Sequence, residues 1–593
     1  MAKNRNSLLK RFLIWRIRHI SNRQFLIILS IITGIAAGIV ATIIKNSVHF
    51  IQNLLEHGIA EEYLKYLYFG LPTIGLILSV FFIRHILRKP VRHGIPNVLH
   101  SLSRNKGYMR PHNTYSSIIT SAFTVGFGGS VGLEGPTVAT GGAVGSVLSK
   151  GLHLDYKQTT LLLGAASVGA MSAIFKAPIA AIVFGLEVIM LDLTMASLIP
   201  LLLASASATI TSYLMLGMDV LYPFNVQHGF VMSEVPYYIA IGVFGGFASL
   251  YFTRTYLFIE KLFEKINKFW NKVIVGGISL GILIFFFPSL YGEGYSAINM
   301  GLSGETSYLF DKSLFAGMQD QFLMTGALLL GLILFKVIAT SITFGAGGVG
   351  GIFAPTLFTG VNLGLLFTLI VGYLGFADLP QQNFALIGMG AMIAAVLHAP
   401  LTAIFLIGDI TGGYELVFPL MITATISYAT VRAFTLHSVY TYQLAQRKEL
   451  LTHDKDKTIL SLMNIENLIE KNFSKVCPQD TLGDLVKVIS KSTRNIFPVT
   501  DENNRFLGMV VMDDIREIMF RPNMYDKVKV SELMFTPETT VDINDSMEVV
   551  ANKFRSSGNY NLPVLDNGHY MGFVSRARVF STYRRMLKQF SED

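Results

Sequence analysis

The sequence predicts an all-α membrane protein with several spans, an internal inverted repeat and broken helices, followed by a small cytoplasmic α/β domain. Its 593 residues are 51% hydrophobic and 15% charged, with a mean hydropathy of +0.49, which is too apolar for an ordinary soluble enzyme. Long apolar stretches fill residues 25–447, and the composition beyond them is charged and globular. Glycine- and proline-rich motifs in the apolar part occur twice. We therefore expect an integral, multi-pass protein of the plasma membrane.

Residues 1–24 are predicted to form a basic segment on the cytoplasmic side. They carry seven Lys or Arg residues and no acidic residue, and such flanks face the cytoplasm. A signal peptide fits poorly, because the basic region is long and no small-residue cleavage site follows it. The charged tail is also expected in the cytoplasm, so the number of crossings is even. The net charge of +9 arises from such flanks and does not predict a nucleic-acid partner.

The apolar stretches differ in length. Residues 25–44 reach the roughly 20 residues that a helix needs to cross the hydrocarbon core, whereas residues 71–83 and 322–335 fall short. Unpaired backbone groups cannot face lipid, so broken helices persist only where they line a cavity or an ion site. The short stretches therefore predict a solute pathway within residues 25–447.

Two pairs of motifs reveal the repeat. LEGPT at 133–137 matches FAPT at 353–356, and APIAAIVFGLEV at 177–188 matches APLTAIFLIGDI at 399–410. Each half thus runs from a glycine-rich turn through a proline and an apolar helix to a second, Ala-Pro helix start. Repeats with helices interrupted by glycine and proline are typical of transporters that bind solute near the bilayer midplane.

The repeated helix starts predict an anion site. The N-terminus of a helix offers unpaired N–H groups and a partial positive charge. A cation site would need several carboxylates or carbonyls, but the chain between Lys336 and Asp378 carries no charge. We assign GAGGVGGIFAP at 345–355 to a turn that faces the ligand, and GVNLG at 360–364 to helix packing.

Glu134, in FGGSVGLEGPTV, is the only charged residue between Tyr115 and Lys150. A charge at membrane depth is costly and usually functional. A carboxylate can imitate a permeating anion, and protonation removes the imitation. Glu134 is therefore predicted to gate the pathway.

Four short motifs carry a resemblance to a known family. They are RHGIP (92–96), GLEGP (132–136), GGIFAP (350–355) and a tyrosine in the last membrane helix, Tyr440. In this order, and on this repeat, the sequence resembles the CLC family of chloride channels and proton-coupled chloride transporters. The resemblance implies a homodimer with one chloride pathway per subunit. It also implies transport without covalent chemistry, so that chloride is a ligand and no cofactor, metal or catalytic residue is required.

The resemblance implies roles for individual residues. Glu134 falls on the gating glutamate, which competes with chloride for the outer site. Ile352 and Phe353 fall where backbone N–H groups hold the central ion. Tyr440 falls on the hydroxyl that contacts this ion from the cytoplasmic side.

Two positions depart from the family pattern. His93 stands where the family has a serine that contacts the central ion, so its imidazole could tune affinity with pH. Alternatively the ring turns away and the backbone of Gly94 and Ile95 serves. Leu133 stands where an arginine is usual beside the gating glutamate, which removes a positive charge from the pathway. Anion preference and voltage dependence therefore stay open.

Glu187 and Val188 bear on the mechanism. Transporters of the family commonly have a proton-relay glutamate at the position of Val188, and the nearest acid here is the preceding Glu187. Valine cannot pass a proton, so we expect a passive, glutamate-gated chloride channel. A proton-coupled chloride antiporter is the alternative, because some coupled members lack this acid.

The tail contains a second repeat. After a linker at 448–471, NIFPVTDENNRFLGMVVMDDI (495–515) is similar to YNLPVLDNGHYMGFVSRARVF (560–580). This resembles a pair of CBS domains, which we place at residues 472–525 and 526–593. Apolar strands around a turn, followed by a helix, suit this assignment.

The resemblance to CBS pairs implies an adenine-nucleotide site with a Thr or Ser and an Asp after the last strand. The first copy has Asp514 but Val511 at the hydroxyl position, and the second has Ser575 but Arg578 at the acid position. Neither copy is complete, so a purely dimer-stabilising role is the alternative. The single Cys477 excludes an intrachain disulfide and a cysteine metal cluster.

Overall fold

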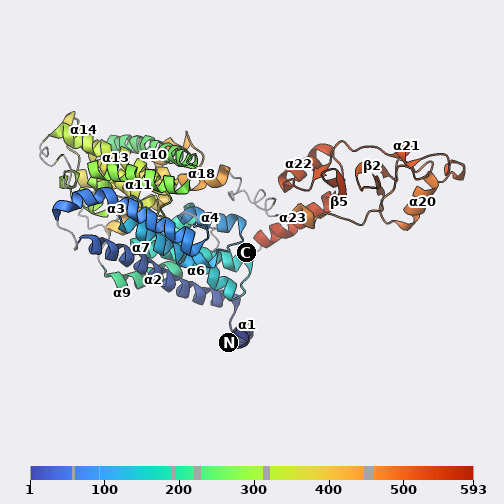
Figure 1. Ribbon diagram of the computed structural model, residues 1–593, viewed down its shortest axis with the longest axis horizontal. Helices are drawn as coiled ribbons and strands as arrows, with labels where there is room; N and C mark the ends of the chain where they lie inside the picture. Colours follow the sequence, from blue (N-terminus) through green and yellow to red (C-terminus); the bar gives the residue numbers. More distant parts are fainter. Residues whose placement is uncertain are drawn as a thin grey trace. The chain divides into compact units, whose positions relative to one another are not determined.

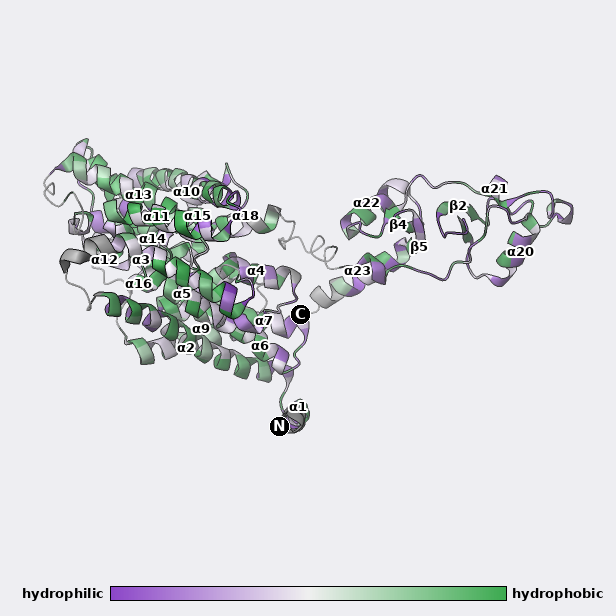
Figure 2. Cartoon of the chain, viewed as in Figure 1, coloured by the Kyte–Doolittle hydropathy of each residue, from purple (hydrophilic) through white to green (hydrophobic). Residues whose placement is uncertain are grey.

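The structure is a computed structural model that forms two compact units, residues 1–450 and 451–593. It describes residues 2–56, 61–91, 94–189, 195–218, 229–310, 321–446 and 463–591, together with Phe315 and Leu460. Figure 1 shows the first unit as a stack of helices and the second as short strands and helices. Hydropathy follows the same division, because apolar residues cover the helices of the first unit and polar residues alternate with them in the second (Figure 2). The predicted fold class is confirmed.

The first unit consists of helices alone among its described residues. They are α1 (Ala2–His19), α2 (Asn22–Glu56), α3 (Glu61–Phe81), η1 (Phe82–Leu87), α4 (Gly94–Arg104), η2 (Pro111–Thr114), α5 (Ser116–Gly126), α6 (Glu134–Gly151), α7 (Tyr156–Phe175), α8 (Pro178–Glu187), α9 (Met195–Leu216), η3 (Met232–Glu234), α10 (Val235–Glu264), α11 (Phe269–Phe286), η4 (Pro288–Leu290), α12 (Tyr295–Leu302), η5 (Ser307–Leu309), α13 (Phe322–Gly345), α14 (Phe353–Tyr373), α15 (Gln381–Leu397), α16 (Pro400–Thr411), α17 (Val417–Arg432) and α18 (Val439–Gln446).

Helix length separates two classes. Within the described residues, 8 helices are long and apolar enough to cross a bilayer, whereas α5, α8, α15, α16 and α17 are apolar but have only 10–17 residues. Short helices leave their ends at membrane depth, where each unpaired backbone group needs a partner. The predicted broken helices are therefore present.

The two halves share backbone conformation as well as sequence. Gly128 and Gly347, each six residues before α6 or α14, have φ of 95° and 96°. Lys176 and His398, which end α7 and α15, have φ of 55° and 57°. Both residues lie directly before the Ala-Pro starts of α8 and α16. A left-handed residue ends a helix sharply, so the chain turns at the same point in each half.

The pair α8 and α16 shows that the halves are inverted. Glu187, the last residue of α8, accepts hydrogen bonds from the first turn of α16, at 3.1 Å from Leu401 N and 2.7 Å from Thr402 N. In return, Asp409 near the end of α16 accepts from Ile179 N at 3.0 Å in the first turn of α8. Each helix thus ends at the start of the other, as in an antiparallel pair. The two acidic residues occupy the positive ends of these helices.

Glycines bring α14 and α15 into contact. A Cβ at Gly364 would lie 2.1 Å from the carbonyl oxygen of Phe384, and one at Gly388 would lie 2.3 Å from that of Gly360. No side chain fits at these distances, so the two backbones touch. The assignment of GVNLG to helix packing is confirmed.

The second unit contains two similar halves. Its elements are η6 (Ile465–Asn467), α20 (Leu482–Lys491), β1 (Ile496–Thr500), β2 (Phe506–Val511), η7 (Pro522–Met524), α21 (Val530–Leu533), β3 (Val541–Asp542), α22 (Met547–Ser557), β4 (Asn561–Asp566), β5 (His569–Ser575) and α23 (Arg576–Ser591). Strands β1 and β2 pair antiparallel, as do β4 and β5, and β3 joins β4 in parallel. Val499 pairs with Gly508, and Val564 pairs with Gly572. The repeated glycines thus hold equivalent positions in the two hairpins.

We predict that Gly364→Ala destabilises the first unit by about 1–3 kcal/mol, the usual cost of overpacking. The added methyl group would push α14 away from the Phe384 carbonyl. Thermal unfolding of the purified protein in detergent, followed by the loss of monodisperse material, measures the change. Gly372→Ala is the matched control, because a Cβ at Gly372 on the same helix meets no atom within 4 Å. Equal stability of both variants would contradict the packing account.

Candidate functional site

Three helix starts meet at one point in the first unit. A Cβ at Gly94, where α4 begins, would lie 2.7 Å from Gly135 Cα in the first turn of α6. A Cβ at Gly135 would lie 3.1 Å from Gly351 Cα, just before α14. Only glycine lets three backbones approach so closely. The N-terminal turns of α4, α6 and α14 therefore converge, and their positive ends add at this point.

A short backbone bridge fixes the starts of α6 and α14. Gly132 N donates to the Gly351 carbonyl at 2.8 Å, and Gly351 N donates to the Gly132 carbonyl at 2.7 Å. The residues that follow, Leu133 and Ile352, have nearly the same backbone angles, with φ of −93° and −89°. The two signature motifs thus form a symmetric pair of helix starts.

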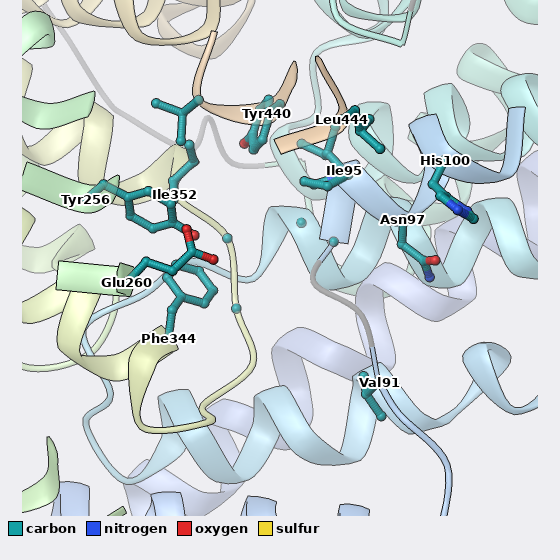
Figure 3. A pocket seen from close by; sticks show the side chains of 16 residues that line it. Val91, Ile95, Asn97, His100, Tyr256, Glu260, Phe344, Ile352, Tyr440 and Leu444 are labelled. Atoms are coloured by element: carbon teal, nitrogen blue, oxygen red, sulfur yellow. The ribbon is translucent and has the colours of Figure 1, made fainter. Parts of the chain in front are cut away.

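A cavity of about 340 Å³ opens beside these helix starts. Gly94 and Ile95 line it from α4, Ile352 from the start of α14 and Tyr440 from α18. Figure 3 shows Tyr440, Tyr256 and Ile352 around one part of this space, with Ile95 and Asn97 on the other side. We call it the Tyr440 cavity. The structure therefore brings together four of the predicted anion-binding residues.

The Tyr440 hydroxyl is suited to hold an anion. It is buried, and it has no hydrogen-bond partner within the described parts of the chain. A buried hydroxyl without a partner is rare and needs an explanation such as an ion. Its place in the cavity wall, near helix N-termini, points to a negatively charged ligand.

Two other residues, Phe353 and His93, are predicted from the sequence to bind the anion. Phe353 is fully buried, and its ring packs against Phe175 with the centroids 5.0 Å apart. Any contact with an ion would involve its backbone, as the sequence predicts. His93 lies outside the described residues, so its predicted role stays a prediction.

Glu134 is the first residue of α6, and its side chain is fully buried. Its Oε1 accepts a hydrogen bond from the Tyr295 hydroxyl at 2.5 Å, whereas Oε2 has no partner among the residues that the structure describes. A Cβ at Gly132 would lie 2.0 Å from Oε2, so the carboxylate folds back over this glycine. A buried carboxylate held by one hydroxyl, beside converging helix starts, can take or release a proton and can give way to an anion.

A second cavity, of about 530 Å³, lies next to Tyr295. Tyr295, Glu293, Lys45 and His49 are among its lining residues, and we call it the Glu293 cavity. Glu293 Oε1 accepts a hydrogen bond from Leu133 N at 3.2 Å, which ties this acid to the residue before Glu134. Leu133 makes this contact through its backbone amide and not through its side chain.

Sequence reasoning missed Tyr295, Glu293 and Lys336. Lys336 is fully buried, and its Nζ donates to the Gly292 carbonyl at 3.0 Å and lies 4.8 Å from the centre of the Phe358 ring. The available signal was YGEGY, an acid between two glycines. Both charged residues lie in an otherwise apolar region, which usually indicates function.

The two residues chosen for coupling lie away from both cavity walls. The carboxylate of Glu187 is engaged by the start of α16, where Thr402 Oγ1 donates to it at 2.7 Å in addition to the two backbone amides. Val188 is buried directly after α8. This geometry gives Glu187 a structural task as a helix cap, and its predicted part in coupling stays untested.

In the second unit, the two candidate nucleotide residues lie at the ends of different hairpins. Ser575 ends β5, and its hydroxyl donates to Glu470 Oε1 at 2.6 Å. Arg494 forms a salt bridge with the other carboxylate oxygen of Glu470 at 2.7 Å. Asp514 lies exposed in the turn after β2. The Ser575 hydroxyl, which would bind the ribose of a nucleotide, is therefore already hydrogen-bonded to Glu470.

Comparison with known families assigns both units. Residues 74–432 match the family model described as voltage gated chloride channel, and residues 465–521 and 530–584 match the CBS domain. The resemblance seen in the sequence is therefore confirmed in both parts of the chain.

Individual proteins are similar over most of their length. A putative chloride channel protein ClcB-like from Ralstonia nicotianae is 30% identical, over 64% of this chain and 85% of its own. An H(+)/Cl(−) exchange transporter ClcA from Vibrio cholerae is 28% identical, over 67% of this chain and 84% of its own. The solved structure of a eukaryotic CLC transporter covers 93% of this chain and 97% of its own, with a TM-score of 0.60 and 17% identity, which shows a common fold.

We predict that acid weakens the second unit through Glu470. Burial disfavours its charge, but hydrogen bonds from Ser575 and Arg494 outweigh burial and hold the pKa of Glu470 below its ordinary value. The stabilisation is therefore present near neutral pH and is lost as the pH falls through this lowered pKa. At neutral pH, Glu470→Gln should lower the free energy of unfolding by about 1–3 kcal/mol.

The measurement uses a fluorophore on Cys477, the single and exposed cysteine, to follow unfolding by urea at several pH values. Exposed Glu466→Gln is the control and should behave like the parent. A loss in Glu470→Gln that is the same at neutral and at strongly acidic pH would contradict the assignment to its charge.

Proposed function

Because the chain belongs to the voltage-gated chloride channel (CLC) family, we propose that this chloride-transporting protein exchanges chloride for protons, without covalent chemistry. The observation that carries the proposal is the state of Glu134. Its buried carboxylate has one hydroxyl donor and one unpartnered oxygen among the described residues, at a helix start shared with the anion cavity. Such a carboxyl group can be protonated and neutral, or ionised and negative. The ionised form favours the positive helix start, whereas the neutral form leaves this start to an anion.

The exchange follows from competition for the helix starts. As a carboxylate, Glu134 can occupy the positive end of α6 in place of chloride. Once protonated it no longer competes, and an anion can enter from either cavity. Release of the proton on the opposite side would let the carboxylate displace the anion again. One residue thereby links the two movements.

The passive channel predicted from Val188 has less support than the exchanger. The Vibrio cholerae relative is named an exchange transporter, although the one from Ralstonia nicotianae is named a putative chloride channel. A proton can reach Glu134 by a route other than an acidic side chain at position 188. The Tyr440 cavity has room for several water molecules, since each takes about 30 Å³ in the liquid. Water there could carry the proton to Glu134.

We further propose that both termini are cytoplasmic and that the membrane is the plasma membrane. The seven basic residues before residue 25 support this orientation. Since Tyr440 is on α18, the last helix of the first unit, its cavity would open to the cytoplasm. The Glu293 cavity would then open to the outside.

A homodimer is also part of the proposal. The short helices α8 and α16 expose apolar side chains, with Ile179 46% and Leu401 52% exposed. Helices of 10 and 12 residues cannot span a bilayer alone. Their shared outer face is therefore better suited to a second subunit than to lipid.

For the tail, stabilisation of the dimer is the favoured role and adenine-nucleotide binding the weaker one. A nucleotide would have to displace Glu470 from Ser575 before its ribose could bind there. Asp514 is exposed and open to a ligand.

We predict that proteoliposomes with a chloride gradient and the membrane potential clamped will move protons against chloride. Simultaneous recording with a chloride electrode and a pH electrode measures both fluxes. A constant ratio of chloride to proton, independent of the size of the gradient, is the expected result. Chloride movement without any change of internal pH would contradict exchange and restore the passive channel.

Glu134→Gln is the matched control for this experiment. The amide keeps the size of the side chain but can neither bind nor release the proton. We expect it to abolish proton movement while chloride still passes, and to remove the pH dependence of chloride flux. Proton flux that persists in Glu134→Gln would place the proton carrier elsewhere.

A further inference from the structure

Glu293 is a second acidic side chain at the start of α6, and the exchange cycle described above does not use it. It lies in the turn between η4 and α12, where Gly292 and Gly294 have φ of 61° and 87°. Its Oε1 accepts from Leu133 N at 3.2 Å. Lys336 holds the same turn by donating to the Gly292 carbonyl at 3.0 Å. The turn therefore positions one carboxylate against the residue that precedes Glu134.

Glu134 lines neither the Tyr440 cavity nor the Glu293 cavity. Its side chain is fully buried. Its Oε1 accepts a hydrogen bond from Tyr295, which lines the Glu293 cavity. Two side chains of this cavity reach the start of α6: Tyr295, which donates to Glu134, and Glu293, which accepts from Leu133 N. Of these two, Glu293 is the acid.

The charges around Glu293 suit a group that gains and loses a proton. Lys45 and His49 face the cavity from α2, and Lys336 approaches from α13. The two lysines and Glu134 all interact electrostatically with Glu293, the lysines by attraction and Glu134 by repulsion. Glu293 therefore has cationic neighbours on two helices and one acidic neighbour at the start of α6.

Tyr68 and Tyr291 complete the polar wall, and their rings lie 4.8 Å apart. The phenol of Tyr295 holds Oε1 of Glu134, which leaves Oε2 as the oxygen without a partner in the described structure. The side of Glu134 that is free to accept a proton is therefore separate from the side that anchors it.

We propose that Glu293 takes a proton from the water of the Glu293 cavity and passes it to Glu134, so that it sets the rate of proton exchange on this side of the membrane. This inference rests on the proposed function. In the first step an O–H bond forms on Glu293 as hydronium becomes water. In the second step this O–H bond breaks as one forms on Glu134, directly or through one water molecule. No electron is transferred, and the step reverses when the proton leaves.

The experiment compares Glu293→Gln with the parent in proteoliposomes of one orientation. Vesicles are prepared with about one protein each, and those with the tail outward are separated by capture through Cys477, the chain's single cysteine. The pH is then varied on each side in turn. We expect proton and chloride exchange to slow by about 100-fold or more, since a positioned acid or base contributes about 100–10,000-fold. The exchange rate should no longer depend on the pH on the Glu293 side of the membrane, but it should still depend on the pH on the other side.

Glu305→Gln is the matched control, because it makes the same change at an exposed glutamate that does not line the cavity. Glu293→Asp keeps the carboxylate and should retain the side-specific pH dependence, which separates a lost proton carrier from a damaged turn. If Glu293→Gln exchanges like the parent, or if both Glu293 variants lose the pH dependence equally, the proposal is wrong.

A double variant tests whether Glu293 acts through Glu134. In the Glu134→Gln background, Glu293→Gln should leave chloride flux unchanged, because no proton acceptor remains. A further loss would show that Glu293 shapes the chloride path instead, which overturns the proposal. If the parent moves chloride without protons, the proposed exchange fails. The pH dependence of chloride flux on the Glu293 side still decides whether Glu293 serves Glu134.

Discussion

Contact between glycine backbones brings together the helix starts at which we propose that the anion binds. Gly94, Gly135 and Gly351 lie so close that a methyl group on one would overlap the next backbone. This contact brings the N-terminal turns of α4, α6 and α14 to one point within the membrane unit. Aligned peptide dipoles give each start a partial positive charge. These three starts, together with the Tyr440 hydroxyl, suit the anion site that we propose.

The same contact explains how a bare carboxylate is tolerated in an apolar protein. Glu134 lies at the positive end of α6 and accepts a hydrogen bond from Tyr295. Glu293 accepts a hydrogen bond from the Leu133 amide and lies near two lysines. Charges at membrane depth usually pair with one another or with backbone groups. In the described structure Glu134 Oε1 has one side-chain donor, Tyr295, which suits the change of protonation state that we propose for it.

The sequence predicts the backbone of this site better than its side-chain contacts. Motifs of five or six residues mark the helix starts, because glycine and proline constrain the chain locally. The repeat and the packing of GVNLG follow from the same local rules. The contact of Glu134 with Tyr295 joins residues 161 apart, and that of Glu187 with Thr402 joins residues 215 apart. No local pattern predicts such pairs, so the contact of Glu187 with the start of α16 could not be predicted from the sequence.

Val188 shows a second limit of sequence reasoning. A passive mechanism inferred from one valine assumes that the proton has a single route, and a cavity with room for water could offer another. In the tail, the sequence shows that both nucleotide motifs are incomplete. It does not show the hydrogen bond from Ser575 to Glu470, because these residues are 105 apart. Sequence motifs identify candidate site residues, and three-dimensional contacts show which of these side chains already have a hydrogen-bond partner.

The central claim is that backbone N–H groups at converging helix starts hold the anion, with Glu134 as its competitor. Bromide replaces chloride and scatters anomalously, so crystals grown in bromide test the claim directly. The account predicts one bromide in the Tyr440 cavity, beside the starts of α4 and α14 and the Tyr440 hydroxyl. In Glu134→Gln it predicts a second bromide at the start of α6. Bromide bound only at lysine or arginine side chains, with none at these helix starts, would contradict it.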